Sequence, residues 1–583
     1  MVREQTAGTS GECLLAWLSL LVAAVGAAIF PIRSFDTFWH LVSGRWILQH
    51  RILPQIDPFR FTSVDESWVD HEWLFQVVAA LIERLAGLDG LIVFRALLVA
   101  AMASVLLVAL RRIGVSPFFA FLLALSTITL ARLRFLIRPE LTSLLALSIL
   151  LACLEEYRRR GGWRWIFGMT LLVIVWANSH LGVLIAPPLS ALFLLGTRLP
   201  GGTGDPRRGD RPAPWAAILG LPVILAAAIC ANPYRHELFE IPTRIAAALG
   251  DLAGVNPEWL PLLAAPRPWV LVAMVVVTGL WVVEWRCVGR IDPSTMLVTL
   301  ALGALTLVSV RHRGLFYLGA VFALAESIAA IRSTRTAAMQ PVARRVWWPA
   351  TIAFVAVLGF VFAPGRGPLG VHDRIGFGFG LAPGRYPAAA VDAVSDWPDL
   401  GNLFNDAATG GYLLWRWYPQ RQVFIDGRNE VGPDLLRELV AAVRSRDSWQ
   451  ALLDRYAIDG GILDNLALPS VNLEGRTSPD GSPRRGTAAA RSSLYFPSEQ
   501  FALVYWDDTA MLFVRRSERR REKIAAMEYS AVRPDEPDLL IARAKHDPQW
   551  RELATEELQR RLATSPRSAR AQALLTALAS LDF

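Results

Sequence analysis

Long apolar runs alternate with short polar segments through the first part of the chain. Runs such as Leu14–Phe30, Leu91–Leu110 and Trp215–Ala231 have about the length that an α-helix needs to cross the hydrocarbon core of a bilayer. We count about eleven runs of this kind, the last of them at Trp347–Phe362. Residues 1–363 are therefore predicted to form an all-α polytopic membrane domain of about eleven transmembrane helices.

The arginines assign the two sides of the membrane. The pair Arg111-Arg112, the segment Glu155–Arg160 and the loop Arg198–Pro212 are rich in arginine, and short loops with an excess of basic residues face the cytoplasm. The N-terminus is then cytoplasmic, and an odd number of spans delivers the chain after residue 363 to the outside. We predict an integral protein of the bacterial inner (plasma) membrane. On this topology all eight histidines fall on the extracytoplasmic side.

The pattern changes after residue 363 to that of a small soluble domain. Short helical and strand-like segments alternate through residues 364–517, which are predicted to form an extracytoplasmic α/β domain. Its clearest element is a hairpin of the strands Phe501–Trp506 and Ala510–Arg515. An insertion at 470–491, rich in Gly, Ser, Pro and Arg, is predicted to be disordered. Residues 518–583 are predicted to be a charged helical tail.

The composition supports a membrane protein and argues against a nucleic-acid-binding protein. The chain has 583 residues, of which 53% are hydrophobic, and a mean hydropathy of +0.36. Its net charge of +8 comes almost wholly from arginines that flank apolar runs, so we predict no nucleic-acid partner. The four cysteines lie in or beside apolar runs, and no disulfide framework is indicated.

The first predicted extracytoplasmic loop, residues 31–90, is long and rich in groups that can exchange protons. Asp36 follows the first span directly, where it could act as a base or metal-binding carboxylate, or simply cap a helix or form an interfacial ion pair. His40 lies four residues later and would share a helical face with Asp36, or it could have a purely structural role. Both residues are candidates for catalysis.

The same loop contains the triplet Asp70, His71 and Glu72. These are ligand types for a divalent cation, but adjacent residues do not share one face of a helix. A divalent cation therefore stays an open alternative, with no ligand set assigned to it. His71 and Glu72 are taken as further catalytic candidates because imidazole and carboxylate groups can transfer protons.

Several arginines lie in predicted extracytoplasmic loops, against the usual preference. A guanidinium matches phosphate oxygens bidentately, so these arginines could bind a phosphate; alternatively, they form ion pairs with loop glutamates. His180 either ends the fifth span or reaches the outer cavity. The segment Arg421–Arg428 is interpreted as a strand followed by a structural turn, Asp426-Gly427-Arg428. The candidate phosphate-binding residues are Arg132, Arg138, His180, Arg311 and Arg313.

The architecture resembles the C-type superfamily of integral-membrane glycosyltransferases, which includes protein O-mannosyltransferases, aminoarabinose transferases and oligosaccharyltransferase catalytic subunits. Asp36, in Asp-Thr-Phe-Trp-His, matches the acidic residue of their first long extracytoplasmic loop. A second resemblance is to a group of bacterial polytopic membrane proteins of no established activity. It is carried by Asp36, Gly44, Pro54, Asp57-Pro58, His71-Glu72-Trp73, Arg138-Pro139, Trp176–His180 and Asp426-Gly427-Arg428.

The first resemblance implies a transferase that moves a sugar from a polyprenyl-phosphate-linked donor to an extracytoplasmic acceptor. Asp36 would accept a proton from the acceptor hydroxyl, and outer arginines would hold the phosphate leaving group. The second outer loop lacks the paired acidic motif of metal-dependent members, which weakens the case for a metal. The rival hypotheses are a transporter or flippase for a lipid-linked saccharide and a non-catalytic membrane scaffold. Almost no charge lies at mid-span, which argues against transport.

Overall fold

The computed structural model describes residues 10–63, 66–202, 211–250, 258–334, 376–428, 433–465, 470–472 and 488–582. The chain forms two compact units, and both take segments from distant parts of the sequence. The first unit consists of Met1–Ser34, Ser43–Leu53 and Val69–Gly380. The second consists of Phe35–Val42, Pro54–Trp68 and Leu381–Phe583. Two segments of the first long loop thus belong with the C-terminal part of the chain.

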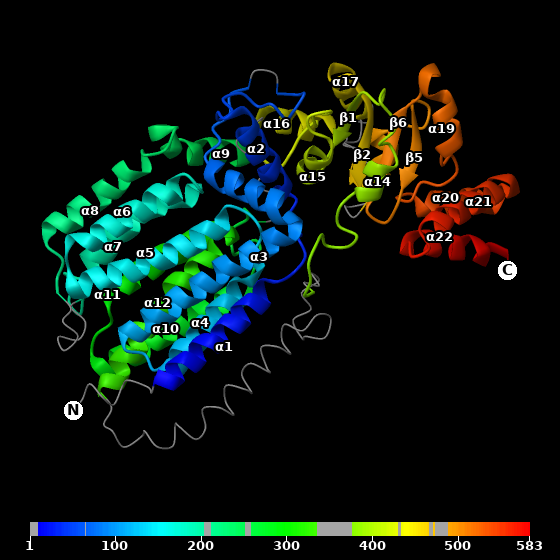
Figure 1. Ribbon diagram of the computed structural model, residues 1–583. Helices are drawn as coiled ribbons and strands as arrows, with labels where there is room; N and C mark the ends of the chain where they lie inside the picture. Colours follow the sequence, from blue (N-terminus) through cyan, green and yellow to red (C-terminus); the bar gives the residue numbers. More distant parts are fainter. Residues whose placement is uncertain are drawn as a thin grey trace, which may run out of the picture. The chain divides into compact units, whose positions relative to one another are not determined.

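The first unit is a bundle of apolar helices (Figure 1). Helix α2 (Asp36–His50) begins in the second unit and ends in the first. The other helices of the bundle are α1 (Ser10–Ala28), α3 (Trp73–Ile113), α4 (Pro117–Ala131), α5 (Glu140–Arg160), α6 (Trp163–Ala177), α7 (Ala186–Gly196), α8 (Trp215–Ile229), α9 (Ile241–Gly250), α10 (Pro268–Val288), α11 (Pro293–Val308) and α12 (Arg313–Thr334). Short 3-10 turns join several of them, among them η1 (Arg132–Arg134), η2 (Leu181–Ile185) and η5 (Val310–His312).

Several of these helices have the length and composition of membrane spans. In the described part of the chain, five helical stretches are long and apolar enough to cross a bilayer: Gly11–Ala28, Trp73–Ile113, Pro117–Arg134, Pro268–Val288 and Val310–Ser333. Four shorter apolar helical stretches accompany them: Trp163–Ala177, Leu181–Gly196, Trp215–Ile229 and Pro293–Val308. The eleventh expected span, Trp347–Phe362, lies outside the described residues. The total number of spans stays a prediction.

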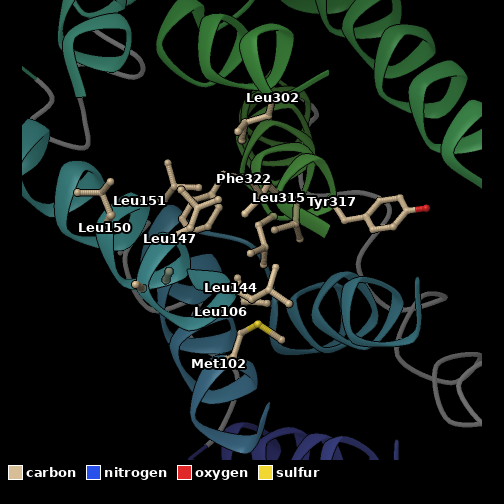
Figure 2. Close-up of a cluster of buried hydrophobic side chains, with 14 of the residues drawn as sticks. Met102, Leu106, Leu144, Leu147, Leu150, Leu151, Leu302, Leu315, Tyr317 and Phe322 are labelled. Carbon is tan, nitrogen blue, oxygen red and sulfur yellow. The ribbon is translucent and has the colours of Figure 1, made fainter. Parts of the chain in front are cut away.

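Packing of apolar side chains holds the bundle together. Small residues at some contacts let neighbouring helices approach each other closely. Figure 2 shows leucines of α5 meeting side chains of α3 and α12, such as Leu106 and Phe322. Gly319 of α12 lies so near α11 that a Cβ atom there would stand 2.7 Å from Leu302 Cδ1. Helices in lipid associate through van der Waals contact of this kind, since lipid is as apolar as leucine.

Helix α3 joins two elements that the sequence predicts separately. The periodicity of the sequence predicts a helix lying along the interface over Glu72–Gly87 and a separate span over Leu91–Leu110. The structure has two helices here that meet at a kink, because Gly87 between them has the non-helical angles φ of 64° and ψ of −165°. Glycine adopts a positive φ at little cost, so the chain can turn there from one helix into the next.

The second unit is built on a four-stranded sheet in the order β1-β2-β6-β5. β1 (Asn402–Asn405) and β2 (Ile458–Asp464) are parallel, whereas β6 (Ala510–Arg515) is antiparallel to both β2 and β5 (Phe501–Trp506). The small α/β domain and its terminal hairpin, predicted from the sequence, are both present. The strand predicted before the turn Asp426-Gly427-Arg428 is wrong, because Val423 makes only an isolated bridge to Arg60.

Helices cover this sheet and continue into the C-terminal tail. They are α14 (Ala388–Asp392), α15 (Ala407–Trp417), α16 (Pro433–Ala442), α17 (Arg446–Arg455), α18 (Arg491–Tyr495), α19 (Arg521–Met527), α20 (Pro537–His546), α21 (Pro548–Thr564) and α22 (Ala569–Ala579). The ends of the insertion at 470–491 pair as β3 (Ser470–Asn472) and β4 (Ala488–Ala490). Glu557 of α21 accepts hydrogen bonds from the backbone of Ser530, Ala531 and Val532, which anchors the tail.

Candidate functional sites in the two units

Loops of the first unit that are distant in sequence meet at one end of its bundle. The backbone N–H of Leu74 donates to the carbonyl of Asn178, and Trp73 Nε1 donates to the Asn178 side chain at 2.9 Å. Asn232 in turn donates to the carbonyl of Ala177 at 2.8 Å. The start of α3 and the ends of α6 and α8 are therefore tied together there.

An ion-pair network lies among these loops. Arg134 Nε donates to Glu140 at 2.9 Å, and its Nη1 lies 3.1 Å from Glu258. Arg138 Nη1 lies 3.4 Å from the second oxygen of Glu258, while its Nε donates to Ser34 at 2.6 Å. Burial alone would raise the pKa of Glu258, but the neighbouring arginines lower it to about 2. Ion pairing thus occupies much of Arg134 and part of Arg138.

Arg311 differs from these two arginines. Its backbone N–H donates to the Glu258 carbonyl at 3.1 Å, which fixes its position. Its guanidinium carbon lies 4.7 Å from the ring centroid of Trp259. Among the described residues, this guanidinium has no hydrogen-bond or ion-pair partner. A positioned guanidinium with five N–H donors is suited to an anion from outside the chain.

The other two candidate arginines contact backbone carbonyls. Arg132 Nε donates to the carbonyl of Ala27 at 3.1 Å, next to the end of α1. Arg313 Nη1 donates to the carbonyl of Val310 at 3.1 Å, within its own turn. These contacts position the two side chains, and their role in phosphate binding stays a prediction.

His180 is held in one tautomer by its neighbours. Trp176 Nε1 donates to Ser143 Oγ at 2.6 Å, so the Ser143 hydroxyl is directed to donate to His180 Nδ1, also at 2.6 Å. The backbone N–H of Gly182 donates to the same Nδ1 at 3.1 Å. With Nδ1 accepting twice, the ring proton of the neutral imidazole lies on Nε2. Sequence reasoning missed Ser143, since it stands inside an apolar run.

The Nε2 side of His180 faces the candidate pair of the first loop. Glu72 Oε1 lies 3.8 Å from His180 Nε2 and 3.6 Å from His71 Nε2. The structure thus brings His180 close to His71 and Glu72, which precede it in the sequence by more than a hundred residues. Across the described ranges, no group of three or more His, Cys, Asp or Glu residues is arranged to hold a metal ion.

We expect His180 to stay neutral through the physiological range. Burial lowers its pKa first, Arg311 lowers it further, and the value falls to about 3. A histidine whose pKa is depressed on folding adds stability above its unfolded pKa of about 6.5, and this is lost as the pH falls toward about 3. Imidazole ¹⁵N NMR between pH 5 and 8 should show an Nε2–H tautomer that does not titrate. Titration near pH 6.5 would contradict the lowered pKa, and a ring proton on Nδ1 would contradict the tautomer assignment.

In the second unit, Asp36 lies beside the turn that contains Gly427. A Cβ atom at Gly427 would stand 2.7 Å from Asp36 Oδ1. On the same helix, Trp39 packs near Gly411 of α15. A Cβ atom added at Gly411 would stand 2.7 Å from the carbonyl oxygen of Phe35. Glycine at these two positions leaves room for the first turn of α2. His40 is buried next to Trp39, with ring centroids 3.6 Å apart.

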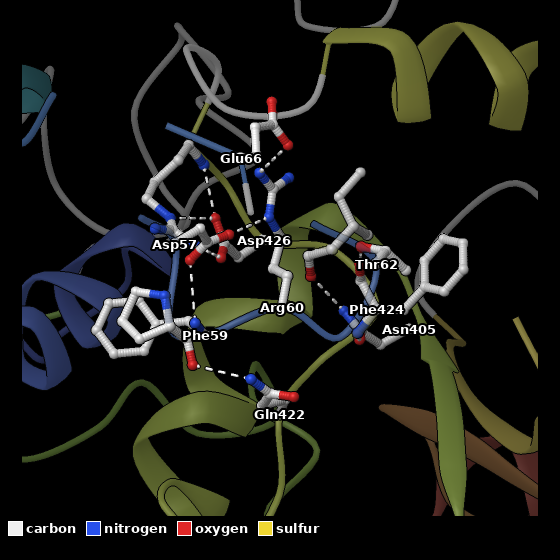
Figure 3. A network of polar contacts seen from close by, with 12 residues as sticks. Asp57, Phe59, Arg60, Thr62, Glu66, Asn405, Gln422, Phe424 and Asp426 are labelled. Carbon is white, nitrogen blue, oxygen red and sulfur yellow. Dashed lines mark hydrogen bonds and ion pairs between the residues drawn. The ribbon is translucent and has the colours of Figure 1, made fainter. Parts of the chain in front are cut away.

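Behind this turn lies a cluster of four fully buried charged side chains (Figure 3). Arg60 Nε donates to Asp57 at 2.8 Å, and Arg428 Nη2 donates to the other oxygen of Asp57 at 2.9 Å. Arg428 Nε also donates to Asp426 at 2.9 Å, and its guanidinium stacks 4.5 Å from the Trp68 ring centroid. The first loop is thereby fixed to the turn 426–428.

Electrostatics favour the ionised forms of Asp426 and Arg428. Burial would raise the pKa of Asp426, but Arg428 and then Arg60 reverse the effect, so its pKa lies below the ordinary value. The pKa of Arg428 is raised by Asp426 and Asp57 in spite of burial. The sequence interpretation took the Asp-Gly-Arg turn for a structural marker alone. The sequence signal for this contact was a pair of oppositely charged residues in each segment, Asp57 with Arg60 and Asp426 with Arg428. It could have predicted that the turn contacts the first loop.

The sequence matches no protein-family model, and no curated protein shares detectable sequence similarity with it. Solved structures do resemble it. The apo form of the oligosaccharyltransferase from Archaeoglobus fulgidus aligns with a TM-score of 0.54 and 10% identity, over 94% of this chain and 86% of that one. The oligosaccharyltransferase AglB from Archaeoglobus fulgidus, in complex with an inhibitory peptide and a dolichol-phosphate, aligns with a TM-score of 0.52 and 11% identity, over 97% of this chain and 86% of that one.

A further similarity is to ArnT from Cupriavidus metallidurans, bound to undecaprenyl phosphate, with a TM-score of 0.49, 9% identity and coverage of 88% and 99%. At identities near 10% the alignment with the archaeal enzyme establishes the fold, and fold by itself does not establish activity. The resemblance to the C-type glycosyltransferases, predicted from the sequence, is confirmed at the level of the fold. The apolar helices and this fold are those of an integral membrane protein.

Proposed function

We propose that this chain, which has the C-type glycosyltransferase fold, transfers a sugar from a polyprenyl-phosphate-linked donor to an extracytoplasmic acceptor. Asp36 accepts the proton of the acceptor hydroxyl as its oxygen attacks the anomeric carbon. The bond from that carbon to the phosphate oxygen breaks, and the electron pair stays on the phosphate. Guanidinium groups of the first unit stabilise the negative charge that grows there.

The observation that carries the proposal is the state of Arg311. It is fixed through its backbone and stacked on Trp259, yet its guanidinium donors are not used by the described residues. The negative charges of Glu140 and Glu258 attract this guanidinium from nearby. Its N–H donors can bind a phosphate bidentately, with a charge-assisted hydrogen bond from each. The archaeal enzyme of similar fold was solved with a dolichol-phosphate, which is a ligand of the proposed class.

His180, Arg138, Arg132 and Arg313 complete the proposed phosphate-binding set. The neutral Nε2–H of His180 is a donor that adds no charge, whereas Arg138 brings a second guanidinium partly shared with Glu258. His71 and Glu72 face the same Nε2–H and would orient it. We assign no divalent cation to this set.

Arg311→Ala is expected to weaken binding of the lipid-linked donor by about 1.5–3 kcal/mol, the value of a charge-assisted hydrogen bond. The measurement is the apparent Kd of the purified full-length chain for a polyprenyl-phosphate sugar. Arg160→Ala is the matched control. This arginine is 56% exposed and paired with Glu156, and it lies at the end of α5 opposite to Glu140 and the ion-pair network. Equal binding by the two variants would remove Arg311 from the site.

We expect the topology to follow the arginine pattern. A reporter fused after Arg160 should read cytoplasmic, and one fused after Phe583 should read extracytoplasmic, because basic loops stay inside. Alkaline phosphatase and green fluorescent protein fusions, which are active on opposite sides, provide the measurement. A cytoplasmic signal from the C-terminal fusion would contradict the predicted odd number of spans.

A further inference from the structure

The first unit has a cavity of about 320 Å³ at the end of the bundle away from the candidate site. Helix α5 connects the two places, since Glu140 lies in the ion-pair network and Arg159 lines the cavity. An α-helix rises 1.5 Å per residue, so these positions are roughly 30 Å apart along α5. None of the proposed sugar-transfer residues lines this cavity.

One wall of the cavity is apolar and as long as part of an acyl chain. On α3 it extends from Ser104 through Val105, Val108 and Ala109 to Arg112, positions that share one helical face. This stretch is about 12 Å long at the rise of an α-helix. Ile149, Ala152 and Cys153 of α5 and Trp165 of α6 form the facing wall.

The other end of the cavity carries two charges of each sign. Arg112 and Arg159 lie there with Glu155 and Glu156. Within the described part of the chain, the side chain of Arg112 donates only to Glu156, at 3.4 Å, and it is half exposed. Its remaining donors can therefore take an anion.

Glu155 is the second, independent feature. It is 3% exposed, and its Oε2 accepts from Arg158 at 2.8 Å. Its Oε1 is buried and has no hydrogen-bond partner in the described structure. A buried carboxylate oxygen costs free energy unless a donor reaches it, and because Glu155 lines the cavity, a ligand bound there can supply that donor.

We propose that this cavity binds a glycerophospholipid whose head group carries both a phosphate and a primary ammonium. The phosphate pairs with Arg112, the ammonium donates to Glu155 Oε1, and an acyl chain lies along the α3 wall. A head group with only negative charge would face two carboxylates, and a quaternary ammonium would have no N–H for Glu155. The arrangement of charges therefore selects the zwitterion with N–H donors.

The test uses the delipidated full-length chain in detergent with three lipids that share dioleoyl tails. Phosphatidylethanolamine is expected to bind about tenfold more tightly than phosphatidylcholine or phosphatidylglycerol, measured by native mass spectrometry, since one charge-assisted hydrogen bond distinguishes them. Equal affinities for the three lipids would overturn the proposal. This comparison needs no variant, so it does not depend on the folding of one.

A pair of matched variants locates the site. Val108→Trp fills the cavity, whereas Val93→Trp makes the same change on the same helix outside it; the two valines are 44% and 47% exposed. Binding of phosphatidylethanolamine should be lost in Val108→Trp and kept in Val93→Trp. Equal binding by both variants would overturn the assignment to this cavity.

Discussion

Asp36→Asn is expected to lower sugar transfer by about two to four orders of magnitude, the usual effect of losing a general base. The amide keeps the shape of the carboxylate but cannot accept the proton of an acceptor hydroxyl. Folding and membrane insertion should survive, because Gly427 leaves the same space for either side chain. The measurement is transfer from a polyprenyl-phosphate sugar in membranes that contain equal amounts of each protein.

Two comparison variants make this result specific. Asp392→Asn removes a carboxylate of the same unit that is 63% exposed and paired with Arg416, and it should leave transfer unchanged. Gly427→Ala keeps Asp36 but places a Cβ atom 2.7 Å from its Oδ1, so the carboxylate must move. Displacement of a reacting group by about 1 Å can cost roughly 10²-fold. Near-normal transfer by Asp36→Asn would refute the assignment, and failure to insert would favour a capping role.

Arg428→Met is expected to destabilise the second unit by about 3–5 kcal/mol, because it leaves the buried Asp426 without its arginine and Asp57 with Arg60 alone. Asp426 receives three hydrogen bonds from this residue, one of them from the backbone, and Asp57 receives another. Hydrogen exchange at the amides of β5 and β6 in the full-length chain would measure the loss.

The double variant Asp426→Asn with Arg428→Met separates charge imbalance from lost packing. It should recover part of the stability, since replacing both partners of a buried pair is less costly than replacing one. Arg437→Ala is the exposed control; its pair with Asp434 is 42% and 93% exposed, and such pairs contribute about 0–1 kcal/mol. Equal exchange in Arg428→Met and Arg437→Ala would mean that the buried cluster adds little stability.

The helical bundle could be predicted from the sequence because each span carries its own signal. An apolar run such as Trp215–Ala231 predicts a helix without information from the rest of the chain. The structure has helix α8 at Trp215–Ile229, in agreement with this prediction. The hairpin of β5 and β6 was equally local. Arg421–Asp426 misled because its strand-like residues pair with the first loop instead of the sheet. Propensity does not specify the partner of a strand.

The candidate sites were predictable residue by residue, but their partners were not. The ion-pair interpretation of the outer arginines holds for Arg134, which is bound to Glu140. Phosphate binding by Arg311 stays a prediction. The contact of Ser143 with His180 joins a residue in an apolar run to a loop, and no spacing rule connects them. The same is true of Asp57 and Arg428, because their contact depends on tertiary structure alone.

The discontinuous make-up of the second unit has a consequence for how the chain is made. Asp57 precedes Arg428 by 371 residues. At about 5–20 residues per second, the ribosome needs roughly 20–70 s to synthesise that interval. Loop segments 35–42 and 54–68 must therefore wait, without their partners, while the helices between them are inserted. Biogenesis of this protein thus includes a period in which these segments lack their native partners, and the second unit can be completed only after most of the chain has been synthesised.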